Sequence, residues 1–227
     1  MIYIGLDDTD MLDTRGTGRL ARDIAAELAA EYVITAVTRH QLSSDPRVPC
    51  THKNSSAVIH LDAPASTVPA VMNRIKALML ADFIPGSDPG LCVTAVVPTA
   101  ITQFGRRAKE ALVSQTEARE LAANYGLPLI GLGGTEDGVI GALAAVGLAA
   151  GGNDGRYIVI GQVRELAGLQ PVDTLLNAGV TAVQTLDGTP VTTGMVLTDK
   201  LRPARRNGRP VAVVQWQDEY WLPLKLD

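Results

Sequence analysis

The stretch Ile2-Tyr3-Ile4-Gly5-Leu6-Asp7-Asp8-Thr9-Asp10 decides how the rest of the sequence is interpreted. Its apolar part, residues 1–6, predicts a β-strand that stops at the aspartates. Three carboxylates within four residues repel one another, and no secondary structure requires them. Ligands of α/β sheets commonly lie beyond a strand end, and Mg²⁺ prefers oxygen ligands while it bridges to substrate phosphates. We therefore expect a magnesium site at Asp7, Asp8 and Asp10; the alternative is a solvated loop in which aspartates cap turns.

Composition restricts the class of protein. The chain has 227 residues, 46% of them apolar, and a formal net charge of -4. This length makes one large domain or two small ones, and the negative charge argues against a protein that mainly coats nucleic acid. We expect a cytoplasmic protein outside the membrane, because no basic leader precedes the first strand and no apolar run approaches the roughly 20 residues that span a bilayer. Cys50 and Cys92 have no metal-like spacing and are expected to be free thiols.

Short apolar runs alternate with helical periods, which predicts a mixed or parallel α/β fold. Predicted helices cover 17–32, 66–80 with Ser66 as cap, 99–125 with a break near 114–116, 139–149 and 172–177. Predicted strands follow at 32–38, 56–61, 91–97, 157–163 and 210–216, the last after an Asn207-Gly208 turn. The glycine-rich stretch 151–155 suggests a boundary. We expect an ATP- and Mg²⁺-binding region over 1–152 and a smaller α+β region over 153–227, with interleaving allowed.

The stretch Thr14-Arg15-Gly16-Thr17-Gly18-Arg19 leads into the first predicted helix. Gly16, Thr17 and Gly18 can offer backbone N–H groups and a hydroxyl to a nucleotide phosphate at the helix N-terminus. The alternative is an ordinary helix start with Thr17 as N-cap.

A glycine-rich stretch, 131–141, also precedes an apolar helix. It matches neither a Walker A loop nor a dinucleotide fingerprint, but Gly133, Gly134, Thr135 and Gly138 are candidates to cradle a nucleotide. Glycines before a buried helix also arise for packing reasons alone.

Two polar segments complete the candidates. The loop 46–56 brings together donors for phosphate or ribose, among them Lys53 and Asn54 with His52 between Thr51 and Lys53; the alternative is an exposed loop. A basic turn near the C-terminus, flanked by two tryptophans, could meet RNA through phosphates and stacking, although such charge runs are more often solvated. The residues of this turn are Lys200, Arg202, Arg205, Arg206 and Arg209, with Trp216 and Trp221 beside them.

Taken in order, these pieces resemble the N-terminal region of the archaeal tRNA-isoleucine agmatinylcytidine synthetase (agmatidine synthase) family. The resemblance covers roughly the first two-thirds of the chain. It rests on Ile4 to Asp10, Gly16-Thr17 before Leu20-Ala21, Leu42 followed by Pro46 to Ala57, Asp88-Pro89-Gly90 and Gly138-Val139-Ile140-Gly141-Ala142-Leu143-Ala144-Ala145.

This resemblance implies a kinase-like domain joined to a ferredoxin-like domain. It also implies use of ATP and Mg²⁺ to phosphorylate a tRNA cytidine, after which agmatine displaces the phosphate. By the same analogy Asp7, Asp8 and Asp10 hold the metal, and residues 133–140 contribute to the nucleotide pocket. Asp7, Asp8, Asp10 and Thr17 are thus the predicted catalytic residues.

Two departures from the family pattern matter. The family has Gly-x-Cys-Thr-Thr after the aspartates and phosphorylates the second threonine, where this chain has Thr17 followed by Gly18. Longer members of the family continue into an OB-fold and a zinc ribbon, which 227 residues with two cysteines do not include. We therefore expect a small-molecule acceptor, with tRNA as the less favoured partner.

Three functions remain open at this level. The first is a Mg²⁺- and ATP-dependent phosphoryl-transfer or ligase-like enzyme. The second is a non-catalytic nucleotide-binding regulatory protein, to which the missing threonine points. The third is a phosphatase of the haloacid-dehalogenase type, with Asp8 as nucleophile, Asp10 as acid, and Lys200 with Glu136 or Asp137 in support.

Overall fold

The fold is built on a 12-stranded sheet, seen in a computed structural model that describes residues 1–51 and 53–226. Along the sheet the strands follow the order β5-β4-β1-β3-β2-β6-β10-β11-β12-β9-β7, and β8 pairs with β11. Both neighbours of β1, which are β3 and β4, run antiparallel to it. The mixed α/β fold class is confirmed, and the parallel alternative is wrong for the part of the sheet that surrounds the aspartates.

The longest strands are β2, β3 and β11, with nine, eight and nine residues. In chain order the strands are β1 Ile2–Asp7, β2 Val33–Gln41, β3 Ser55–Asp62, β4 Gly90–Thr94, β5 Leu129–Gly131, β6 Arg156–Val159, β7 Leu169–Pro171, β8 Ala182–Gln184, β9 Met195–Leu197, β10 Ala204–Arg206, β11 Arg209–Gln217 and β12 Tyr220–Pro223. The helices are α1 Thr17–Leu28, α2 Val68–Ala81, α3 Thr99–Glu110, α4 Gln115–Asn124, α5 Gly138–Gly151 and α6 Val172–Asn177, with 3₁₀ turns η1 Ala65–Thr67 and η2 Val163–Glu165. Within the described ranges every helix is too short or too polar to span a bilayer.

The predicted elements are present, and several of their ends differ for local reasons. The predicted strand 91–97 ends at Thr94, because the Thr94 hydroxyl bonds to both the N–H and the carbonyl of Val96 and so closes a turn. Ser66 lies in a 3₁₀ turn and does not cap α2, which begins at Val68 without a side-chain cap. The predicted break near 114 is confirmed, since the Ser114 hydroxyl accepts from Glu117 N–H and starts α4.

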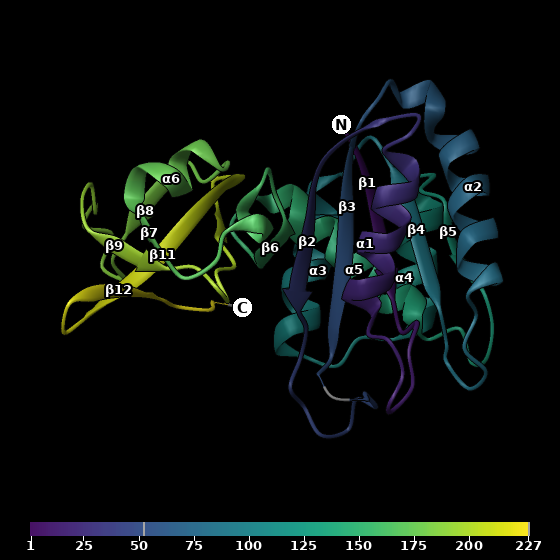
Figure 1. Cartoon of the computed structure of the whole chain (residues 1–227). Helices are drawn as coiled ribbons and strands as arrows, with labels where there is room; N and C mark the ends of the chain where they lie inside the picture. The colour runs from purple at the N-terminus through teal and green to yellow at the C-terminus, as the bar shows by residue number, and fades with distance from the viewer. Residues whose placement is uncertain (52, 227) are drawn as a thin grey trace.

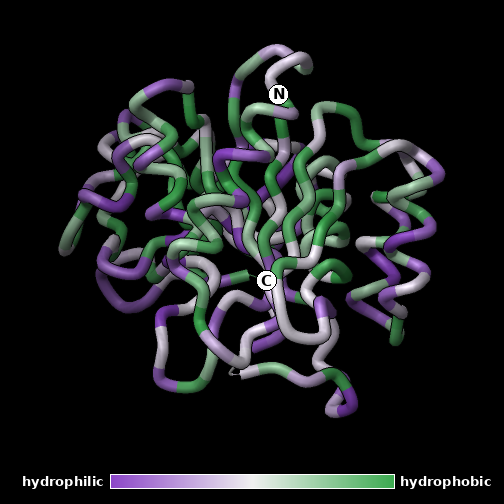
Figure 2. Tube along the Cα trace, turned by 90° about the vertical axis from the view of Figure 1, so that its right-hand side faces the viewer, coloured by the Kyte–Doolittle hydropathy of each residue, from purple (hydrophilic) through white to green (hydrophobic). Residues whose placement is uncertain are grey.

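Helices cover both faces of the sheet (Figure 1): α1 and α2 lie on one face, and α3, α4 and α5 lie on the other. The alternation of side chains along β1 sorts the two faces. Ile2, Ile4 and Leu6 are fully buried in the core that they share with α1 and α2. Gly5 points the other way, toward α5. In Figure 2 the central strands are largely apolar, and hydrophilic segments gather toward the outside.

Contact between β1 and α5 is unusually close because glycines replace side chains along it. A Cβ atom on Gly5 would lie 2.2 Å from the carbonyl oxygen of Ala142. A Cβ atom on Gly141 would lie 1.7 Å from Oδ2 of Asp7. The start of α5 therefore packs directly against the end of β1 that carries the aspartates.

Beyond β2 the sheet continues into the C-terminal part of the chain. β6 pairs with β2 on one side and with β10 on the other. β10 and β11 form a hairpin, and its two turn residues, Asn207 and Gly208, have φ angles of 49° and 74°. These values fit the two-residue turn that the Asn-Gly pair predicts. A separate apolar cluster, which includes Leu175, Val196 and Val214, forms the core of this part.

A buried polar network, which the sequence did not indicate, joins side chains of β2 and β3. The Thr38 hydroxyl lies 2.9 Å from the Nε2 atoms of both His40 and His60. Asp154 lies 2.9 Å from Nδ1 of His40, and Lys109 pairs with the same carboxylate. Burial lowers the pKa of both histidines, so both rings are neutral at physiological pH.

Substitution of Gly5 tests the contact between β1 and α5. Gly5→Ala places a methyl group against backbone and is expected to lower the free energy of unfolding by about 3 kcal/mol or more. Gly18→Ala is the matched control, because its Cβ atom would meet nothing closer than Ile158 at 3.4 Å. Urea denaturation of both variants makes the comparison, and equal stability of the two would contradict this packing.

Candidate functional site

The aspartates at the end of β1 border a cavity of about 450 Å³. The cavity lies between the aspartates, the loop that joins β2 to β3, the segment between α3 and α4, and the start of α5. Asp7, Asp8, Asp10 and Thr17 all line it, as do Lys53 and Asn54. The residues that three separate motifs predicted are thus brought together at one place.

Crowding of acidic groups dominates the electrostatics of this cavity. Burial, followed by repulsion from Asp8, raises the pKa of Asp7 to about 7. Burial, followed by repulsion from Asp88, Asp10 and Asp137, raises the pKa of Asp8 to about 6. A bound cation would relieve this repulsion, because it favours the ionised form of every carboxylate around it.

The three predicted ligands differ in how they are held. Asp10 is held at both carboxylate oxygens: Thr17 donates to Oδ1 at 3.0 Å and Thr51 donates to Oδ2 at 3.1 Å. Asp7 packs against Ser56, whose hydroxyl opposes part of the rise in its pKa. Asp8 has a positive φ of 50°, and within the described residues its carboxylate accepts no hydrogen bond. Asp8 is therefore the ligand most available to a cation.

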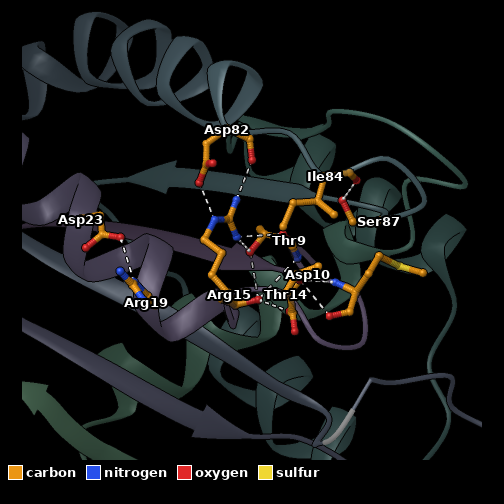
Figure 3. Close-up of polar contacts among 11 residues, drawn as sticks. Thr9, Asp10, Thr14, Arg15, Arg19, Asp23, Asp82, Ile84 and Ser87 are labelled. Atoms are coloured by element: carbon orange, nitrogen blue, oxygen red, sulfur yellow. Dashed lines mark hydrogen bonds and ion pairs between the residues drawn. The ribbon is translucent and has the colours of Figure 1, made fainter.

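An arginine fixes the loop that carries these aspartates (Figure 3). Arg15 pairs with the carboxylate of Asp82 and donates to the Asp82 carbonyl at 2.6 Å, just beyond the end of α2. It also donates to the Thr9 carbonyl at 2.9 Å. The Thr9 hydroxyl donates in turn to Thr17 at 3.1 Å. Arg15 thus holds the loop to α2 and is not oriented toward a ligand.

The motif at the start of α1 contributes to the cavity through one residue. Gly16 occupies the N-cap position without a side-chain cap bond, and Thr17 is the first helical residue. Thr17 as N-cap is therefore wrong. Gly18 faces Ile158, and among the described lining residues this motif is represented by Thr17.

The loop between β2 and β3 forms a second wall. Asn54 donates to the Ser43 carbonyl at 2.9 Å, which ties the two ends of this loop together. Arg47 pairs with Asp45, whereas the exposed Lys53 has no partner within the described residues. His52 lies outside the described residues. Lys53 is thus the cation at this wall that is available to a phosphate group.

Part of the glycine-rich stretch 131–141 packs around Asp88. Thr135 N–H donates to Oδ1 of Asp88 at 2.5 Å, and a Cβ atom on Gly134 would lie 1.9 Å from the same oxygen. Gly133 packs against Phe83, and Gly138 donates to the Asp88 carbonyl at 3.0 Å. None of these four residues is among the described residues that line the cavity. Their predicted nucleotide contacts stay a prediction.

Sequence reasoning missed the wall that the segment between α3 and α4 contributes. Leu112 and Val113 bring apolar side chains to the cavity. Gln115 lies beside them and donates to the Asp137 carboxylate at 3.0 Å. The wall is therefore partly apolar, as expected of a site that accepts a nucleoside or another small organic group. The break in the predicted helix near 114 was the available signal.

The donor set fits a magnesium ion that shares its ligands with a phosphate. Among the described residues no three acidic, histidine or cysteine side chains are already arranged to hold a metal. Mg²⁺ usually binds through one or two carboxylates, waters and substrate phosphates, so a complete protein cage is not required. Asp8 and Asp7 are the residues that would hold it.

The residues of the basic turn near the C-terminus lie in different environments. Arg205 is buried and donates to the carbonyl of Ala149 at 3.1 Å and to the hydroxyl of Tyr157 at 2.5 Å. Trp216 stacks edge-on against Trp221, with ring centres 4.9 Å apart. Alternation along β11 places Trp216 on the face opposite Arg209, and their separation along the strand is about 23 Å. Arg209 and Trp216 therefore do not share one face of β11, and the predicted contact of this turn with RNA stays a prediction.

Comparison with solved structures agrees with the geometry of the fold. A TiaS-tRNA(Ile2)-ATP complex matches 64% of this chain with a TM-score of 0.57 and 21% identity. The matched part of the chain shares its fold with part of TiaS. A tRNA fluorescent labeling enzyme matches 64% of the chain with a TM-score of 0.55 and 21% identity, and apo TiaS, a tRNAIle2 agmatidine synthetase, matches 64% with a TM-score of 0.53 and 20% identity.

The match covers only part of this chain and only part of each solved structure. This chain spans 36% of the TiaS chain in the ATP complex and 35% of the other two. No known protein-family description matches the sequence, and no curated protein matches it. The resemblance expected from the sequence is therefore confirmed for the fold.

The raised pKa values predict how stability depends on pH. Asp7 has a folded pKa of about 7 against an ordinary value of 3.8, so the folded state holds its proton more tightly than the unfolded state does. The contribution of Asp7 to the free energy of unfolding therefore falls as pH rises from roughly 4 to 7. Asp7→Asn removes this loss. Without divalent cations, the free energy of unfolding of the variant should therefore exceed that of the wild type near pH 8 by on the order of 2 kcal/mol.

Denaturation with urea in EDTA, near pH 4 and near pH 8, measures this difference. The buried neutral histidines make the free energy of unfolding rise with pH in both proteins. The difference between variant and wild type therefore isolates the contribution of Asp7. Added Mg²⁺ should stabilise the wild type more than the variant at the higher pH. A difference that is the same at both pH values would refute the crowding of these carboxylates.

Proposed function

We propose that this protein binds ATP with Mg²⁺ in the cavity at the end of β1 and transfers a phosphoryl group to an acceptor. The observation that carries the proposal is that one unpaired carboxylate and one unpaired ammonium group line the same cavity. The Asp8 carboxylate and the Lys53 ammonium both line it, and neither is engaged by a described residue. A cation on the aspartates and the Lys53 charge on the loop between β2 and β3 suit a bound triphosphate.

Each group has a distinct role in this proposal. Asp8 and Asp7 hold the metal, and Asp10, fixed by Thr17 and Thr51, shapes the loop and adds negative charge beside it. When bound, Mg²⁺ would neutralise charge on the transferred phosphoryl group. The Lys53 ammonium orients the phosphates, and the apolar wall at Leu112 and Val113 excludes water from the base or the acceptor.

We propose a small molecule as the acceptor. The cavity volume of about 450 Å³ is in the range of small-molecule sites, and the net charge of -4 does not favour a polynucleotide. The neighbours include TiaS complexes with tRNA(Ile2), ATP, AMPCPP and agmatine, so tRNA is the alternative acceptor. We also propose a cytoplasmic location, and a division of the chain into an ATP- and Mg²⁺-binding region over 1–152 and a smaller region over 153–227.

The phosphatase interpretation receives less support from the site. It requires Lys200 near Asp8, but Lys200 is exposed in the segment between β9 and β10 and is not among the described lining residues. The regulatory alternative predicts binding without turnover. This alternative rests on Gly18, which stands where the agmatidine synthase family has the threonine that becomes phosphorylated.

Calorimetry with ATP, with and without Mg²⁺, followed by chromatography of the nucleotide products, tests the proposal. Mg²⁺-dependent binding with formation of ADP, AMP or pyrophosphate supports a transfer enzyme and shows which bond is broken. Mg²⁺-dependent binding without any product, in the presence of candidate acceptors, supports the regulatory alternative. Absence of binding at millimolar ATP contradicts both.

Asp8→Asn tests the proposed role of Asp8 as a ligand of Mg²⁺. Asparagine tolerates the positive φ at this position and keeps the shape of the side chain, so the fold should be retained. The affinity for Mg²⁺-ATP should fall by roughly tenfold or more, because a charged ligand is lost. Asp23→Asn is the control, since Asp23 is exposed on α1 and pairs with Arg19. An unchanged affinity in Asp8→Asn would remove the metal assignment.

A further inference from the structure

A second cavity lies away from the aspartates, where the β10–β11 hairpin meets β8. Its volume is about 610 Å³, and it shares no lining residue with the aspartate cavity. Arg206 and Arg209 line it together with Asn153, Thr181 and Gln184. No acidic side chain belongs to its described lining.

The two arginines are held close together by the backbone. Arg206 and Arg209 are directly opposite each other in the ladder and close the two-residue turn of the hairpin. Like charges in such a cross-strand pair destabilise a hairpin. Neither arginine forms an ion pair with any described residue, and the bond recorded for Arg206 goes to the Arg205 carbonyl at 3.2 Å. The repulsion is therefore left uncompensated within the described part of the chain.

The remaining groups of the cavity add mainly donors. The Asn153 side chain accepts from Asn207 N–H through Oδ1 at 2.8 Å, so its amide N–H₂ group is not used in this bond. The Thr181 hydroxyl donates to the Pro210 carbonyl at 2.9 Å, so its proton is already used. Asp154, the acidic residue next to Asn153, is engaged by His40 and Lys109. The cavity thus presents two guanidinium groups and amide donors without a balancing negative charge among its described lining residues.

The turn is also rigid, which favours binding. Gly208 N–H donates to the Gly152 carbonyl at 2.8 Å, and the Asn207 N–H is held by Asn153. The hairpin is therefore attached at its tip to the turn that follows α5. Because the backbone that carries Arg206 and Arg209 is already fixed, binding of an oxyanion costs only the conformational entropy of the two side chains.

We propose that this cavity is an anion-binding site that takes phosphate groups through Arg206 and Arg209. A guanidinium group presents parallel N–H donors that match two oxygens of a phosphate, and two such groups suit a ligand with more than one phosphate. The source of the phosphates is either a small polyphosphorylated molecule or the backbone of an RNA strand. The site is independent of the function proposed for the aspartate cavity.

Binding of tripolyphosphate to the full chain in EDTA, followed by calorimetry at low salt, tests this site. Without divalent cations the aspartate cavity repels the probe, so the two sites do not confuse each other. Arg206→Gln and Arg209→Gln should each weaken binding by roughly tenfold. Arg74→Gln removes the same charge from an exposed residue of α2 that pairs with Glu27, and it should bind as the wild type does.

Thermal denaturation provides a second measurement that does not depend on heat of binding. Tripolyphosphate should raise the melting temperature of the wild type and of Arg74→Gln but not that of the double variant Arg206→Gln/Arg209→Gln. Without the anion the double variant should be at least as stable as the wild type, because the cross-strand repulsion is removed.

A short single-stranded RNA distinguishes the two sources of phosphate. RNA that binds more tightly than tripolyphosphate and loses affinity in the same variants identifies a polynucleotide as the ligand, whereas binding of tripolyphosphate alone identifies a small molecule. Equal losses in Arg74→Gln and in the cavity variants, or no binding of either probe at millimolar concentration, would overturn the site. Failure of ATP to bind the aspartate cavity would leave these results unaffected.

Discussion

The close approach of α5 to β1 is the constraint on which the rest of the structure depends. Gly5 and Gly141 leave no side chain between the strand and the helix, so the Asp7 carboxylate lies directly against the first turn of α5. The same helix start packs on the Asp88 and Gly90 backbone through Gly138. Acidic groups from β1, from the segment before β4 and from the start of α5 are therefore forced into one small volume.

This proximity has an electrostatic cost that the chain does not remove by itself. Asp7 and Asp8 carry raised pKa values because burial and neighbouring carboxylates both disfavour ionisation. Arg15, the cation nearest in sequence, is turned toward Asp82 and serves to fix the loop. A site that keeps its repulsion in the absence of ligand binds a cation more readily, because the cation relieves it.

The sequence predicted elements from periodicity and turn chemistry, and these were its reliable parts. The first strand, the stripe of α2 and the Asn207-Gly208 turn depend on local preferences. The aspartate motif and Lys53 line one cavity, and their predicted roles in binding stay a prediction. Long-range pairing was not available from local pattern, so the antiparallel neighbours of β1 and the network of Thr38, His40 and His60 were missed. The glycines of 131–141 permit close packing in the structure, and their predicted role as a phosphate cradle stays a prediction, since both uses require residues without a Cβ atom.

Hydrogen–deuterium exchange with and without Mg²⁺-ATP would show whether nucleotide binds in the aspartate cavity, because it locates bound nucleotide without assuming which residues bind it. We expect slower exchange in residues 7–10, in the loop between β2 and β3, and in the segment between α3 and α4. Exchange in β9 and α6, which lie away from the aspartates, should be unchanged. Protection confined to other segments, or none at saturating nucleotide, would contradict the assignment of this cavity as the ATP site.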